Sequence, residues 1–279
     1  MARFLPEAIE SVLAQDYHSI EYIVLDGGST DPTLQILETY RDRLRYWTGK
    51  DKGPSDAINR GFQRATGEIF VWLNADDRFL PGAVRTAVAY FLAHPDVDVV
   101  YGEANWIDEN GSLISRYPTL PFSAKVLERD CFICQPAAFV RASAYRGCGL
   151  DPDVNMSFDY DLWIRMAKQK YRFAKIPQYL AESRMHSGSL TIGARERVFL
   201  ASIELLQRHY GYVPFSWVFG YVAYHFDGRD QFFQPLQPSL SKYLAALRTG
   251  LRLNRGRAWR FFGEWLTAPF HAVGRRFNS

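Results

Sequence analysis

Cysteine is scarce in this sequence, and long apolar runs are missing. The cysteines are Cys131, Cys134 and Cys148, and the first residues, MARFLPEAIESVLAQ, carry acidic side chains that a signal peptide lacks. An odd number of cysteines without such a signal favours a reducing compartment, so we expect a cytoplasmic protein. The single C-x-x-C has no second pair or histidine cluster, which favours structural cysteines over a metal or redox site. No run of about 20 apolar residues occurs, so we expect no membrane-spanning helix.

The sequence also lacks an excess of charge of one sign, because its 33 Lys or Arg residues nearly balance its 30 Asp or Glu residues and leave a net charge of +3. This charge gives no general argument for binding nucleic acid, and we expect no such partner. The glycine pair at Gly27 and Gly28 lacks the G-x-G-x-x-G spacing, so a dinucleotide cofactor is not indicated. Apolar residues, in contrast, make up 47% of the chain, which is enough for one large domain with or without an appendage.

Expected strands and helices alternate through the first hundred residues. The hydrophobic pattern predicts strands at 21–25, 45–48, 68–73 and 98–101, and helices at 4–13, 34–44, 54–65 and from 81 onward. This alternation predicts an α/β fold with a doubly wound, mostly parallel sheet, similar to a Rossmann fold. Ligands bind beyond the carboxyl ends of the strands in such sheets. We therefore expect the loops at Asp26 and at Asp76–Asp77 to face one crevice.

The pattern changes after residue 103, and it divides the chain into three parts. Residues 1–103 and 104–210 are expected to form two halves of one domain, with a hairpin turn at 108–111 between strands at 104–107 and 112–117. Residues 211–279 are expected to form a helical, aromatic and basic extension. Its segment 241–279 holds eight Lys or Arg residues against one acidic residue, Glu264. That composition predicts contact with a membrane surface, and the alternative is a tail packed on the domain with a solvated basic face.

The acidic residues at the two strand ends are candidates for binding a ligand. Asp76 and Asp77 are costly to bring together without a cation, and their oxygens suit Mg²⁺ or Mn²⁺. The alternative is an acidic turn that caps the next helix. Asp26 is placed to accept hydrogen bonds from a base or a ribose, and the alternative is a turn carboxylate.

Two polar segments in the second half are also candidates. Asp159 and Asp161 lie near an expected helix start, where they suit either capping or general-base catalysis. His186 follows an expected strand in a small polar loop, and it suits either a structural role or contact with a metal or phosphate.

These segments, in their order and spacing, resemble the inverting glycosyltransferases of family 2, which have the GT-A fold. The matching motifs are DGGSTD at 26–31, DKGPSDAINRG at 51–61, GEIFVWLNADD at 67–77, DYDLW at 159–163 and RMHSGS at 184–189. The resemblance covers about residues 2–192. The family's DXD motif usually has an acidic residue where this sequence has Ala75, although many members vary at that position.

The resemblance implies a role for each matching position. Residues 1–103 would be the nucleotide-sugar-binding half and residues 104–210 the acceptor-side half. The residues implied to bind the nucleotide sugar are Asp26 at the base, Asp76 at the ribose or sugar, and Lys52, Gly53 and Asp56 in the nucleotide pocket. Asp77 would bind Mg²⁺ or Mn²⁺, with His186 at the metal or the diphosphate, and Asp159 would be the catalytic base.

The activity implied is transfer of a sugar from a nucleotide-diphosphate donor to a hydroxyl of a glycan or lipid-linked acceptor, in surface polysaccharide or glycolipid synthesis. We expect a cytoplasmic protein with peripheral contact at the inner face of the cell membrane. Two alternatives stay open. One is nucleotidyl transfer, which also uses acidic strand ends and metals, and the other is an inactive, membrane-associated protein that binds nucleotide sugars.

The start of the sequence departs from the family pattern. Family members usually begin with a strand and a short loop before the first helix, whereas this sequence begins at that helix. The resemblance therefore implies an unfilled strand position beside the strand that ends at Asp26, with unpaired backbone groups. We expect an N-terminally incomplete chain, with reduced or absent activity in these 279 residues.

Overall fold

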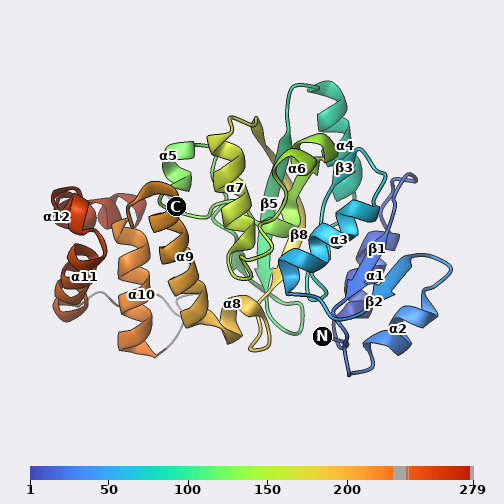
Figure 1. Cartoon of the computed structure of the whole chain (residues 1–279), viewed down its shortest axis with the longest axis horizontal. Coiled ribbons are helices and arrows are strands. Elements are labelled where there is room, and N and C mark those ends of the chain that lie inside the picture. The colour runs from blue at the N-terminus through green and yellow to red at the C-terminus, as the bar shows by residue number, and fades with distance from the viewer. Residues whose placement is uncertain (229–236, 238, 277–279) are drawn as a thin grey trace. The chain divides into compact units, whose positions relative to one another are not determined.

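The computed structural model describes residues 1–228, 237 and 239–276, and it divides into two compact units (Figure 1). The first unit comprises Met1–Ser123 and Cys131–Ser189. The second comprises Ala124–Asp130 and Leu190–Ser279. The boundaries predicted at residues 103 and 210 stay predictions.

The first unit contains two sheets. The smaller sheet pairs β1 (Ile23–Asp26) with β2 (Arg45–Thr48) in parallel. The larger, six-stranded sheet has the order β3-β7-β5-β8-β4, with β6 paired to β5. Its strands are β3 (Ile69–Phe70), β4 (Arg78–Phe79), β5 (Val99–Ile107), β6 (Leu113–Arg116), β7 (Ala138–Arg141) and β8 (Phe173–Arg184).

The larger sheet confirms the α/β class and corrects one detail of it. Strands β5 and β8 run parallel, whereas β3–β7, β5–β7, β4–β8 and β5–β6 run antiparallel. The sheet expected to be mostly parallel is therefore mixed. For the β5–β6 pair the reason lies after residue 103, where the predicted turn at Asp108–Gly111 joins the two strands as a hairpin. Such a short connection is open only to antiparallel strands.

No hydrogen-bonded pair of strands among the described residues connects the two sheets. The strand expected at 68–73 forms ladder bonds only at Ile69–Phe70, on the side facing β7. No strand among the described residues pairs with the other side of β3 or joins β3 to β1. A side chain joins the segments instead, because Glu21 Oε2 accepts hydrogen bonds from the N–H groups of Thr66 (2.7 Å) and Gly67 (3.2 Å).

Helices of the first unit pack on the sheets through apolar residues at helical spacing. The buried face of α1 (Leu5–Leu13) is the predicted one, formed by Leu5, Ala8, Ile9 and Val12. This face contacts two apolar cores, one with Leu37 and one with Phe79. The other helices are α2 (Thr33–Thr39), α3 (Pro54–Arg64), α4 (Ala83–Ala93), α6 (Ala142–Cys148) and α7 (Phe158–Lys168).

The second unit is helical over its described residues. Its helices are α5 (Ala124–Leu127), α8 (Leu190–Gly193), α9 (Arg195–Tyr210), α10 (Phe215–Asp227), α11 (Leu240–Leu253) and α12 (Ala258–Arg276). Residues 229–236, 238 and 277–279 of the predicted extension lie outside the described residues. Within the part of the chain that is described, every helix is too short or too polar to cross a membrane.

Candidate active site

Asp26 ends β1 and organises the glycine turn that follows it. Its Oδ2 accepts hydrogen bonds from the N–H groups of Gly28 (3.1 Å) and Ser29 (3.1 Å) and from Thr48 Oγ1 (2.6 Å). Burial raises the pKa of Asp26, but the hydrogen bonds from Ser29, Thr48 and Gly28 outweigh it, so the pKa lies below its ordinary value. The carboxylate is therefore held ionised beside the turn, and its Oδ1 accepts a longer hydrogen bond from the N–H of Ser29 (3.3 Å).

The loop from Lys52 to Asp56 forms a second wall of this region. Asp56 Oδ2 accepts a hydrogen bond from the N–H of Lys52 (3.1 Å), which fixes the loop where α3 begins. Gly53 has φ of +124°, and a Cβ there would lie 2.1 Å from Asn155 Oδ1. Glycine is favoured here, because other residues rarely adopt this backbone angle and a Cβ would displace the Asn155 side chain.

Asp51 links the two loops, and the sequence reasoning did not single it out. Its Oδ1 accepts a hydrogen bond from the N–H of Gly53 (2.9 Å). A Cβ on Gly27 would lie only 2.7 Å from Asp51 Oδ2, so the two loops are in direct contact. Asp51 is the first residue of the DKGPSDAINRG motif at 51–61, and its position there could have identified it as a candidate.

The acidic loop before β4 holds Asp77 in a fixed position. Its Oδ1 accepts a hydrogen bond from the N–H of Arg184 (2.9 Å), and its Oδ2 accepts one from Asn74 Nδ2 (2.9 Å). Asp77 is 4% exposed. Burial raises the pKa of Asp77 to about 7, and the neighbouring charge of Asp76 adds to this rise. Two carboxylates are therefore held together against their mutual repulsion.

His186 lies beside Asp76 in this structure. Its Nε2 is 3.0 Å from Asp76 Oδ2, and its ring centroid is 4.7 Å from that of Phe4. The sequence predicted that His186 and Asp77 share a metal, and the geometry pairs the histidine with the other aspartate of the loop. We refer to Asp76, Asp77 and His186 together as the acidic cluster, since the two aspartates are neighbours in the chain and the histidine contacts Asp76.

The residues of this cluster fit a divalent cation in their chemistry. Carboxylate oxygens suit hard cations, and a cation would relieve the repulsion that raises the pKa of Asp77. Across residues 1–228, 237 and 239–276, no three His, Cys, Asp or Glu side chains form a complete set of metal ligands. Mg²⁺ commonly takes one or two protein carboxylates and completes its shell with substrate phosphates and water.

Asp159 lies in the first turn of α7 and is partly buried. Burial raises the pKa of Asp159, and hydrogen bonds from backbone N–H groups only partly oppose this. Burial also raises the pKa of the Cys134 thiol, and the charges of Asp77 and Asp159 raise it further. The charges of the predicted base and of the acidic loop thus act on the same buried thiol.

Asp161 has a structural role in this geometry. It is 1% exposed, and its Oδ2 accepts a hydrogen bond from Arg165 Nε (2.6 Å). Arg165 also donates to the carbonyl groups of Cys148 (2.9 Å) and Gly149 (2.7 Å). Of the two aspartates in the DYDLW motif, only Asp159 is without an arginine partner among the described contacts.

Gln135 supports the acidic loop from a distant part of the sequence. Its Nε2 donates to the carbonyl of Trp72 (2.6 Å), and its Oε1 accepts from Asn74 Nδ2 (3.1 Å). Since 61 residues separate Gln135 from Asn74, no local pattern pointed to this contact.

Comparisons of the sequence identify its family. The model of glycosyl transferase family 2 matches residues 2–146, which is just over half of the chain. An uncharacterized glycosyltransferase of Rickettsia typhi is 30% identical over 200 residues, covering 68% of this chain and 62% of that protein. The chain spans 62% and 32% of the length of the first two curated relatives that it matches.

Solved structures share the fold. TarS of S. aureus in complex with UDP-GlcNAc aligns with a TM-score of 0.60 at 17% identity, covering 90% of this chain and 78% of that one. The mannosyltransferase PcManGT of Pyrobaculum calidifontis, in complex with GDP-Man and Mn²⁺, aligns with a TM-score of 0.55 at 17% identity, covering 99% and 77%. The mixed sheet with its surrounding helices is therefore a GT-A glycosyltransferase fold. The chain belongs to glycosyl transferase family 2.

Proposed function

We propose that this protein transfers a sugar from a nucleotide-diphosphate donor to an acceptor hydroxyl, with inversion at the anomeric carbon. The observation that carries the proposal is the buried acidic loop, in which Arg184 and Asn74 hold Asp77, and His186 contacts Asp76. Asp159 is the candidate base, and burial raises its pKa. A carboxylate with a raised pKa suits the role of a general base toward an acceptor hydroxyl.

The donor would lie along the loops at the strand ends. Asp26 would contact the base, and Lys52, Gly53 and Asp56 would line the nucleotide pocket. Asp76 would face the ribose or the sugar. The donors bound by the similar structures, UDP-GlcNAc and GDP-Man, support this class of substrate.

Asp77 and His186 would hold Mg²⁺ or Mn²⁺, in agreement with the Mn²⁺ in the complex of PcManGT. When bound, such an ion neutralises charge on the departing diphosphate. Asp159 would take the proton from the acceptor hydroxyl as its oxygen attacks the anomeric carbon. A single displacement inverts the configuration at that carbon, and no protein acid is needed.

The acceptor would be a glycan or lipid-linked glycan of a surface polysaccharide or glycolipid, reached at the inner face of the cell membrane. Exposed apolar side chains of α11 and α12 support membrane contact, with Leu240 74%, Leu244 51% and Trp259 86% exposed. The exposed Arg252 and Arg255 lie between them in the sequence. Exposed aromatic and basic side chains together favour an anionic lipid surface.

Vesicle flotation tests this contact. The protein is expected to float with vesicles that contain anionic phosphatidylglycerol, to stay unbound with neutral vesicles, and to dissociate at high salt. A Trp259→Ala variant is expected to bind several-fold more weakly, because the indole is largely exposed. Leu92→Ala, which removes an exposed side chain of the first unit, serves as the control. Equal flotation with neutral vesicles, or none with either kind, would contradict membrane contact through this extension.

Donor turnover tests the enzymatic proposal. The protein is incubated with Mn²⁺, a panel of UDP and GDP sugars and candidate glycan acceptors, and nucleotide diphosphate is measured. Release of nucleotide diphosphate together with an inverted glycoside is the result that supports the proposal, at a reduced rate if the chain is incomplete at its N-terminus. Pyrophosphate release would instead indicate nucleotidyl transfer, and donor binding without release would indicate an inactive nucleotide-sugar-binding protein.

A further inference from the structure

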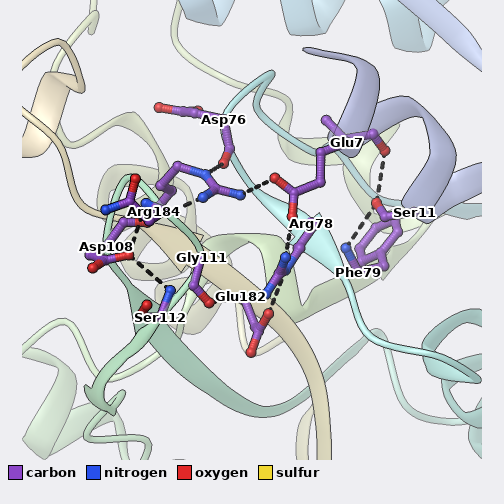
Figure 2. A network of polar contacts seen from close by, with 12 residues as sticks. Glu7, Ser11, Asp76, Arg78, Phe79, Asp108, Gly111, Ser112, Glu182 and Arg184 are labelled. Carbon is purple, nitrogen blue, oxygen red and sulfur yellow. Dashed lines mark hydrogen bonds and ion pairs between the residues drawn. The ribbon is translucent and has the colours of Figure 1, made fainter. Parts of the chain in front are cut away.

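Arg184, at the end of β8, is an arginine buried within the polar network of Figure 2. It is 3% exposed. Its Nε donates to the carbonyl of Asp76 (2.9 Å), its Nη1 donates to the carbonyl of Asp108 (3.2 Å), and its Nη2 forms an ion pair with Glu7. The guanidinium also lies 4.9 Å from the ring centroid of Phe4. Burying a charge is costly, and these contacts offset that cost.

Arg184 contacts the acidic loop twice, through different atoms. The side chain holds the main chain of Asp76, and the backbone N–H of Arg184 holds the carboxylate of Asp77 (2.9 Å). Two residues further along the chain, His186 Nε2 meets Asp76 Oδ2 at 3.0 Å. One residue thus fixes both aspartates relative to the histidine.

A second arginine balances the charge of this network. Arg78 directly follows the acidic loop, and it pairs with Glu182 of β8 and with Glu7 of α1. Glu7 therefore bridges the two arginines, as Figure 2 shows. Two glutamates against two arginines leave this group electrically neutral. The two arginines therefore have glutamate partners of their own, and neither side chain forms an ion pair with Asp76 or Asp77 among the described contacts.

The geometry favours arginine over any other cation at position 184. Its planar guanidinium presents several donors in fixed directions, and here they serve carbonyls and a carboxylate from three different segments. A lysine would keep the positive charge near Glu7 but would lose the simultaneous bonds to Asp76 and Asp108. Without the bond from Arg184 Nε to the carbonyl of Asp76, the main chain of the acidic loop would no longer be held by this side chain.

We propose that Arg184 is a positioning residue for the donor site. It holds Asp76, Asp77 and His186 in one arrangement, and Glu7 holds its guanidinium in place. This inference rests on the proposed function, because it assigns the cluster to a donor diphosphate and its cation. Arg184 itself touches neither the substrate nor the reacting atoms.

The variants Arg184→Lys and Glu7→Gln test this inference, with Arg172→Gln as the control. Arg172 is an exposed arginine just before β8 that pairs with Asp96. Mn²⁺ binding is measured by electron paramagnetic resonance of the free ion, with and without UDP or GDP. KM for donor and acceptor, kcat and Tm are measured alongside. Glu7 is 41% exposed at its side chain, so its variant is expected to fold even where Arg184→Lys is unstable.

The expected result for Arg184→Lys is a Mn²⁺ affinity lowered by about 10- to 100-fold, as for other groups that orient metal ligands. The KM for donor is expected to rise while the KM for acceptor stays unchanged, and excess Mn²⁺ should restore part of kcat. Glu7→Gln should change the same quantities by a smaller factor. Arg172→Gln should leave them all unchanged.

Wild-type Mn²⁺ affinity in both variants would overturn the inference, whatever happens to Tm. A lower Tm without any change in Mn²⁺ affinity or donor KM would overturn it as well, since a merely structural residue behaves in that way. The proposed function fails by a different result, namely a wild-type protein that releases no nucleotide diphosphate. The comparison of Mn²⁺ affinities decides the role of Arg184 even then.

Discussion

Replacing Asp159 with Asn is expected to lower kcat by about 10²- to 10⁴-fold, the range that a positioned general base contributes. Asparagine has nearly the same shape as aspartate but cannot take a proton from the acceptor hydroxyl. The donor affinity should stay near that of the wild type, because Asp159 lies on α7 and not in the nucleotide loops. Release of nucleotide diphosphate under saturating donor and acceptor measures the effect.

The pH dependence of kcat gives a second readout for Asp159. Burial raises its pKa, so the carboxylate becomes protonated at a higher pH than an ordinary aspartate. Because the base must be ionised, kcat should fall as pH decreases through this raised pKa. Asp153→Asn removes an exposed carboxylate in the preceding loop and serves as the control. A kcat for Asp159→Asn within a few-fold of the wild type would rule out its role as the base.

Replacing Asp77 with Asn is expected to change activity and stability in opposite directions. Donor turnover should fall by about 10²-fold or more, the scale of removing one group that stabilises charge in a reaction. The free energy of unfolding should rise in metal-free protein near pH 8, because a buried carboxylate beside Asp76 is replaced by a neutral amide. One new contact opposes this gain, since Asn74 Nδ2, which now donates to Asp77, would face another amide.

The sign of the pH dependence follows from the raised pKa of Asp77. The folded protein binds this proton with a pKa of about 7, whereas an unfolded chain binds it near pH 4. The free energy of unfolding of the wild type therefore decreases as pH rises from about 4 through about 7, because the folded protein gives up this proton at a higher pH than the unfolded chain. Asp77→Asn lacks the titrating group, so this decrease is absent in the variant.

The stability advantage of Asp77→Asn should thus grow by about 1–3 kcal/mol between pH 5 and pH 8. Thermal and urea unfolding in the presence of EDTA measure it at both pH values. Asp42→Asn is the control, since that side chain is 95% exposed. If the difference in free energy of unfolding between Asp77→Asn and the wild type does not change with pH, or becomes smaller as pH rises, the raised pKa of Asp77 is contradicted.

The sequence predicted most elements of the first unit close to their observed bounds. The hydrophobic pattern located α1, α3 and β2, and the D-E-N-G turn located the β5–β6 hairpin. The strand expected at 68–73 was too long, because only Ile69–Phe70 has a strand partner. Periodicity reports burial, whereas a strand also needs a neighbour with which to pair. That neighbour depends on the rest of the sheet.

The sequence by itself determined the family and the chemical groups of the site. Asp76, Asp77, Asp159 and His186 were recognisable as candidates because each stands in a short motif, and the family model covers residues 2–146, which include the first two. A motif states which groups are present, since it is a property of neighbouring residues.

The tertiary structure alone decided which of these groups meet and what holds them. It placed His186 beside Asp76, it directed both oxygens of Asp77 to Arg184 and Asn74, and it paired Asp161 with Arg165. The residues that fix the acidic loop lie about 60 to 110 positions away in the chain. Hydrogen bonds act over a few ångströms in space, and only the folded chain brings residues so distant in sequence within that range.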